Sequence, residues 1–108
     1  METINREEAR RLVTNGREVT VVEVLDSDRF GEFHLPGAIN VPFDENFDEH
    51  MREAVPDKSR AVLVYCHDAE CSASAEAAAR LDELDYAEVY DYEPGKIDWN
   101  EAGLPVET

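Results

Sequence analysis

The fold follows from residues 60–84, which read RAVLVYCHDAECSASAEAAARLDEL. Residues 60–65 form a short apolar run rich in β-branched side chains, which is typical of a strand buried on both faces. Cys66 follows at the point where such a strand would leave the sheet, and residues 67–71 are too few to do more than turn. Because open α/β sheets place their chemistry beyond the carboxyl ends of the strands, Cys66 lies where a reactive residue is expected.

The alanine-rich stretch after this turn is predicted to form an amphipathic helix. Apolar side chains recur there at helical spacing, at Ala73, Ala77, Leu81 and Leu84. Ser72 directly precedes them, and we expect its hydroxyl to cap the helix by accepting a backbone N–H.

Segments typical of strands and of helices alternate along the rest of the chain. Further strands are predicted at residues 19–25, 38–41 and 87–92, and helices at 4–15, 26–33, 44–54 and 97–102. Asn5 and Glu8 resemble a capping box, Gly16 is expected to end the first helix, and turns are expected at 36–37 and 94–95. No repeat or linker is evident, so residues 1–108 are predicted to form a single α/β domain, a parallel sheet with helices on both faces.

The composition limits the classes of partner and the compartment. The 108 residues carry 26 acidic and 10 basic side chains, a net charge of −16, which repels nucleic acid and anionic membranes. The charge fits either an ordinary acidic protein or a cytosol at very high salt, where repulsion is screened within about 3 Å at 1 M. Neither a membrane span nor a signal peptide is evident, so we expect a cytoplasmic protein whose two cysteines are reduced thiols rather than a disulfide framework.

A thiolate at Cys66 would face the amino terminus of the following helix. The helix macrodipole is positive there, and a curled loop directs backbone N–H groups at the sulfur. The same cradle suits a persulfide, which forms when the thiolate takes a sulfane sulfur from a donor and is consumed when an acceptor removes it.

Three segments resemble the rhodanese (sulfurtransferase) family, in the order and spacing found there. They are VLVYCHDAECS at 62–72, FHLPGAINVP at 33–42 and YEPGKIDWNEAGLPVE at 92–107. The resemblance implies a small domain around a parallel sheet of about five strands, with Cys66 as the sulfur-carrying catalytic residue. It implies no cofactor and no metal, and its partners would be a small-molecule or protein sulfur donor and an acceptor. The active-site loop that it assigns to substrate binding consists of His67, Asp68, Ala69, Glu70, Cys71 and Ser72.

The sequence departs from the family pattern at functionally relevant positions. Many members carry an Asp and, two residues later, an Arg after the first strand, where this chain has Glu23 and Leu25. The contacts of that Arg must therefore be absent or supplied by another residue. Asp68 and Glu70 stand in the loop where thiosulfate users often have arginines, and their charge would repel an anionic donor and oppose the thiolate.

Alternatives remain for the second cysteine and for the function. Three roles are open for Cys71: a residue that lines the loop, a resolving thiol that attacks a modified Cys66, or a metal ligand. The spacing of Cys66, His67 and Cys71 differs from that of common metal sites, and a fourth ligand is missing. A Cys66–Cys71 disulfide requires Cα atoms within about 7 Å, which a curled loop permits. The alternative to an enzyme is a non-catalytic binding or redox-sensing module that uses Cys66 and Cys71.

Overall fold

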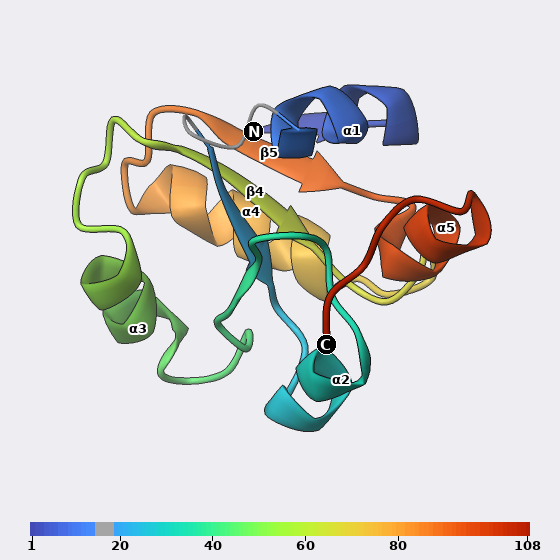
Figure 1. Cartoon of the computed structure of the whole chain (residues 1–108). Helices are drawn as coiled ribbons and strands as arrows, with labels where there is room; N and C mark the ends of the chain where they lie inside the picture. The colour runs from blue at the N-terminus through green and yellow to red at the C-terminus, as the bar shows by residue number, and fades with distance from the viewer. Residues whose placement is uncertain (15–18) are drawn as a thin grey trace.

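A parallel sheet covered by helices forms the core of the protein in the computed structural model, which describes residues 1–14 and 19–108 (Figure 1). Within these residues the sheet has five strands in the order β1-β5-β4-β2-β3. The strands are β1 Glu2–Ile4, β2 Val19–Glu23, β3 Ile39–Asn40, β4 Ala61–Tyr65 and β5 Val89–Tyr92. All four strand pairings are parallel, which confirms the α/β class predicted from the sequence.

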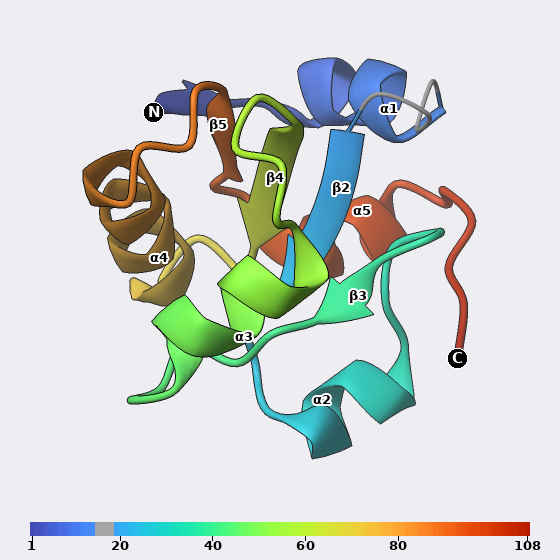
Figure 2. The ribbon, with the colours of Figure 1, turned by 90° about the vertical axis from the view of Figure 1, so that its left-hand side faces the viewer.

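Helices lie on both faces of this sheet and form two cores (Figure 2). In the described residues the helices are α1 Arg6–Thr14, α2 Ser27–Glu32, α3 Phe47–Ala54, α4 Ala73–Glu83 and α5 Gly95–Glu101. One core buries Phe47 and Met51 of α3 with Ala77 and Leu81 of α4, and the spacing of the last two predicts their burial. On the opposite face α1 and α5 cover the sheet, and Trp99 is the largest side chain that they bury.

Strand β4 is the centre of the sheet and is flanked by β2 and β5. All five of its residues are buried because side chains alternate between the two cores. Val62 and Val64 join the core beneath α3 and α4, whereas Leu63 and Tyr65 join the core beneath α1 and α5. Cys66, the next residue, belongs to the α3 and α4 side.

The amino-terminal segment differs from its prediction. Residues 2–4 form strand β1, paired with β5, and α1 begins only at Arg6. A three-residue edge strand with one buried side chain, Ile4, is too short to show the alternation that marks a strand. The capping box is confirmed: the Glu8 N–H donates to Asn5 Oδ1 at 2.9 Å and the Asn5 N–H to Glu8 Oε1 at 3.2 Å. The predicted stop at Gly16 lies outside the described residues.

Two of the predicted turns place glycine in the left-handed region. Gly37 has φ +73° and Gly95 has φ +80°, values that side chains with a Cβ adopt only with strain. Each predicted strand is present but shorter than its apolar run, since β2 ends at Glu23 and β3 comprises only Ile39–Asn40. Every helix in the part of the chain that the structure describes is too short or too polar to traverse a lipid bilayer.

Candidate active site

Cys66 occupies the position predicted for a reactive residue, directly after the central strand β4 and before the loop that leads into α4. Its side chain is fully buried against the core beneath α3 and α4. The 11-residue helix α4 begins at Ala73, so its amino terminus lies at the end of the same short loop. The sulfur therefore lies at the carboxyl edge of the sheet, next to the positive end of a helix.

The first turn of α5 fixes the backbone of this loop. The Lys96 N–H donates to the Cys66 carbonyl and the Ile97 N–H to the His67 carbonyl, both at 3.0 Å. Helix amino termini have N–H groups without intrahelical partners, and here two of them hold the cysteine loop. Gly95 makes this approach possible, because a Cβ at that position would lie 2.6 Å from the carbonyl carbon and oxygen of His67.

Asp68 organises the rest of the loop. Its Oδ1 accepts the Glu70 N–H at 3.0 Å, and its carbonyl accepts the Cys71 N–H at 3.1 Å. Two of the N–H groups expected to face a bound sulfur therefore bind Asp68 in this structure. The physical reason is that an aspartate side chain readily captures the N–H two residues further on.

The turn at Asp68 brings Cys71 back to Cys66, and the two residues form a disulfide with their Cα atoms 6.2 Å apart. Cys71 remains partly exposed, whereas Cys66 is fully buried. The expectation of two reduced thiols is therefore wrong for this state of the protein. The spacing of the two cysteines permitted the bond but did not require it, since the pairing depends on the turn between them.

Ser72 does not cap α4 in the predicted way. No hydrogen bond joins its side chain to the backbone of the first turn; its hydroxyl instead donates to Glu76 Oε2 at 3.0 Å. Its backbone has φ −87° and ψ −8°, which is helical, whereas a capping serine needs extended angles to direct its oxygen back to the N–H groups.

The remaining loop residues take different positions. Ala69 and Glu70 are exposed, and His67 is half-buried with its Nδ1 enclosed and without a hydrogen-bond partner. His34 lies outside the loop, with Nδ1 2.9 Å from the Phe30 carbonyl and its ring stacked on Phe30. Among residues 1–14 and 19–108 no group of three or more His, Cys, Asp or Glu side chains is arranged to hold a metal ion.

Lys96 makes buried polar contacts with Glu23, the residue at the position where many family members have Asp. Its ammonium is fully buried and donates to Glu23 Oε2 at 3.1 Å and to the carbonyls of Arg29 and Phe33 at 2.7 and 2.8 Å. Glu23 Oε1 also accepts the Tyr65 hydroxyl at 2.8 Å. Burial, with the neighbouring Glu23 charge, raises the pKa of Tyr65 above its usual range, so the phenol stays protonated and donates. This network ties β2, β4, α2 and α5 together beneath the loop.

Sequence reasoning missed Asp91, a buried carboxylate near the loop. It lies on β5 opposite Val64, which is two residues before Cys66, and it is 2% exposed with Oδ1 unpartnered. Burial raises its pKa, and a hydrogen bond from Ser74 of α4 partly offsets the effect. The signal in the sequence was an acidic residue inside an otherwise apolar strand.

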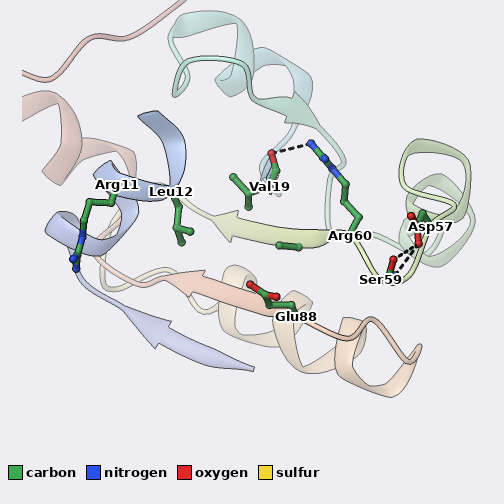
Figure 3. Close-up of a pocket in the computed structure, with 8 residues that line it drawn as sticks. Arg11, Leu12, Val19, Asp57, Ser59, Arg60 and Glu88 are labelled. Carbon is green, nitrogen blue, oxygen red and sulfur yellow. Dashed lines mark hydrogen bonds between the residues drawn. The ribbon is translucent and has the colours of Figure 1, made fainter. Parts of the chain in front are cut away.

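A surface pocket elsewhere on the molecule is distinct from this site (Figure 3). It lies at the amino ends of the strands, since Val19 and Ala61 are the first residues of β2 and β4. Its lining consists of Arg11, Leu12, Val19, Asp57, Ser59, Arg60, Ala61 and Glu88. The pocket is therefore at the opposite end of the strands from Cys66.

The fold is that of an α/β protein with a parallel sheet and a cysteine loop between its central strand and the next helix. The sequence matches the rhodanese-like domain family over residues 5–102. The chain belongs to this family, which confirms the resemblance drawn from its three segments.

Curated relatives include both enzymes and a regulator. Residues of this chain are 37% identical over 90 positions to an HTH-type transcriptional regulator of Mycobacterium tuberculosis, covering 83% of the chain and 38% of the regulator. Thiosulfate sulfurtransferase PspE of Escherichia coli is 35% identical over 68 residues, 63% of this chain and 62% of PspE. Thiosulfate sulfurtransferase GlpE of Shewanella oneidensis is 30% identical over 90 residues, 83% of the chain and 84% of GlpE. The chain thus spans less than two thirds of the first two relatives.

Solved structures share the fold. A protein of Bacillus halodurans superposes with a TM-score of 0.87 at 22% identity, over 98% of this chain and 76% of that one. At this identity the similarity establishes the architecture alone.

Proposed function

We propose that this protein is a rhodanese-type sulfurtransferase that carries sulfane sulfur as a persulfide on Cys66. The observation that carries the proposal is the placement of Cys66, at the carboxyl end of β4 and in a loop held by the first N–H groups of α5. Membership of the rhodanese-like family and the similarity to PspE and GlpE support it.

The reaction has two steps. With the disulfide reduced, the Cys66 thiolate attacks the sulfane sulfur of a donor, and the leaving group departs as sulfite when the donor is thiosulfate. The amino terminus of α4 and the loop N–H groups that Asp68 does not bind stabilise the resulting anionic persulfide. A thiophilic acceptor, such as cyanide, then takes the outer sulfur and regenerates the thiolate.

The loop favours a donor that carries less negative charge than thiosulfate. Asp68 and Glu70 flank the cysteine, and the loop contains no arginine to bind a sulfonate. A persulfide on a small molecule or on a protein meets less repulsion at low ionic strength, and high salt screens the difference.

The test is thiocyanate formation by the reduced protein at about 1 M KCl, where the screening length is about 3 Å. Thiosulfate and cysteine persulfide serve as donors and cyanide as acceptor. We expect turnover by the parent protein and by Ala75→Ser, a change on the exposed surface of α4, and none by Cys66→Ser. Turnover that survives in a folded Cys66→Ser variant, or absent turnover with both donors, contradicts the proposal.

A second candidate function is a redox-sensing module. The Cys66–Cys71 disulfide favours it, and a related sequence forms part of a transcriptional regulator. In this case the reduced protein would close the disulfide readily under mild oxidation and no donor would load Cys66. Intact mass of the Cys71→Ser variant after donor treatment separates the two functions, because a sulfurtransferase retains one extra sulfur atom on Cys66 and a sensor gains none.

A further inference from the structure

We propose that Cys71 is a resolving thiol that discharges the Cys66 persulfide as hydrosulfide and closes the Cys66–Cys71 disulfide. This inference rests on the sulfurtransferase function proposed above and adds a product, sulfide, and a second reacting residue. It assigns the disulfide a place in a reaction sequence.

The loop itself positions Cys71 for this step. The Asp68 carbonyl holds the Cys71 N–H at 3.1 Å, and the Asp68 carboxylate holds the intervening Glu70 N–H. Cys71 also packs against the core cluster that contains Cys66. The turn is therefore supported by hydrogen bonds and apolar contacts in addition to the sulfur–sulfur bond.

The geometry selects which sulfur of the persulfide is attacked. The Cα atoms lie 6.2 Å apart and the two Sγ atoms are bonded, so Cys71 reaches the inner sulfur, the Sγ of Cys66. Attack on the outer sulfur would only move the persulfide to Cys71. Attack on the inner sulfur expels the outer one, and the reaction is irreversible once sulfide leaves the site.

The step balances without an external oxidant. The Cys71 thiol and the Cys66 persulfide, Cys66–S–S⁻, give the Cys66–Cys71 disulfide and HS⁻. The new bond joins the two Sγ atoms, the bond to the outer sulfur breaks, and the proton of Cys71 leaves with the sulfide. The two cysteine sulfurs together lose two electrons, and the sulfane sulfur gains them.

Return to the starting state requires a dithiol, and the structure indicates its point of attack. Cys66 is fully buried, whereas Cys71 is partly exposed, so an incoming thiolate meets the sulfur of Cys71. Cys66 leaves as the thiolate, and the second thiol of the reductant then frees Cys71. The net reaction converts a sulfane donor and a dithiol into sulfide, the desulfurated donor and a disulfide.

A single-turnover experiment tests the role of Cys71. The full chain is reduced, freed of reductant and mixed with thiosulfate in the absence of oxygen. A second experiment uses cysteine persulfide as the donor. With thiosulfate, released sulfite reports loading of Cys66 and released sulfide reports attack by Cys71. We expect the parent protein to release one equivalent of each and to lose two hydrogen atoms in intact mass. Cys71→Ser and Cys71→Ala should release sulfite alone and retain one extra sulfur, mapped to Cys66.

Controls separate the failure of this inference from the failure of the proposed function. Ala75→Ser should behave as the parent protein, and Cys66→Ser should release neither product. Sulfite without sulfide from the parent protein, with the extra sulfur retained, overturns the resolving role and leaves the sulfurtransferase function intact. No loading of Cys66 in any variant with either donor overturns both. Equal sulfide release by the parent and both Cys71 variants also overturns the resolving role.

Discussion

Replacing Gly95 with alanine tests whether the packing of α5 against the loop places Cys66. The new Cβ would lie 2.6 Å from the carbonyl carbon and oxygen of His67 and 2.7 Å from the nitrogen of Asp68. All three atoms belong to the backbone, so no flexible side chain can move aside. The loop or the start of α5 must shift, and the bonds from the Lys96 and Ile97 N–H groups to the Cys66 and His67 carbonyls are lost.

The magnitude follows from two contributions. Alanine at φ +80° costs about 1–2 kcal/mol relative to glycine. Loss of the bonds from the Lys96 and Ile97 N–H groups costs about 1 kcal/mol each. Together these lower the free energy of unfolding by roughly 3–4 kcal/mol, which corresponds to about 12–25 °C in melting temperature for a domain of this size.

Two other glycines provide matched controls. Gly37 has φ +73°, but a Cβ at that position would have no neighbouring atom within 4 Å. Gly37→Ala should therefore lower the free energy of unfolding only by the conformational contribution of about 1–2 kcal/mol. This is about a third to a half of the effect expected for Gly95→Ala. Gly31 lies in α2 with neither feature, and Gly31→Ala should be neutral or stabilising by about 0.5–1 kcal/mol.

The assays are urea unfolding and the rate of Cys66 alkylation, both with the disulfide reduced. We expect Gly95→Ala alone to change the alkylation rate, because only this substitution displaces the loop. If Gly95→Ala is no less stable than Gly37→Ala and its alkylation rate is unchanged, then the contact between α5 and the loop does not position the cysteine.

Four further predictions concern charge. Asp91→Asn should raise stability at neutral pH but not near pH 3. Burial raises the pKa of Asp91 in the folded protein above its usual 3.8, so the parent protein loses stability as the pH rises above 3.8 and the buried carboxyl ionises. A difference in unfolding free energy that is constant with pH contradicts this. Lys96→Met should lower the free energy of unfolding by about 3–5 kcal/mol, because it leaves Glu23 buried and unpaired. In urea titrations the double variant Lys96→Met/Glu23→Gln should recover part of this loss. If the effects of the two substitutions on unfolding free energy simply add, the two residues are not paired. Asp68→Asn keeps the oxygen that accepts the Glu70 N–H but removes the negative charge. It should speed sulfur transfer from thiosulfate about threefold at low salt and leave the rate unchanged in molar KCl. An equal increase in rate at both salt concentrations rejects a charge effect. The protein should be more stable in molar KCl than in dilute buffer, and equal melting temperatures exclude a high-salt adaptation.

Local sequence signals predicted most of the fold. The apolar run at 61–65 is strand β4, and the capping pair Asn5 and Glu8 marks the start of α1, because both depend on residues close in the chain. The spacing of Ala77 and Leu81 likewise identified the buried side of α4. Strand β1 was missed because its three residues are held by pairing with β5, which no local pattern records.

The site was predicted in outline, and its internal contacts were not. The position of Cys66 after a buried strand follows from the sequence, and so does the loop. The partner of Glu23 is Lys96, 73 residues further along the chain, and only the folded sheet and α5 bring them together. The capping prediction for Ser72 failed because its backbone is already helical, with φ −87° and ψ −8°, and no pattern in the sequence shows this.

Lys96 gives the protein a defined order of assembly. Its N–H fixes the Cys66 carbonyl, while its ammonium holds Glu23 and the carbonyls around α2. During synthesis Cys66 leaves the ribosome before Lys96 does, so the cysteine exists for a time without the contacts that α5 makes to its loop. A nascent chain halted before residue 95 should therefore expose Cys66 to alkylation, and release of the last turns should protect it.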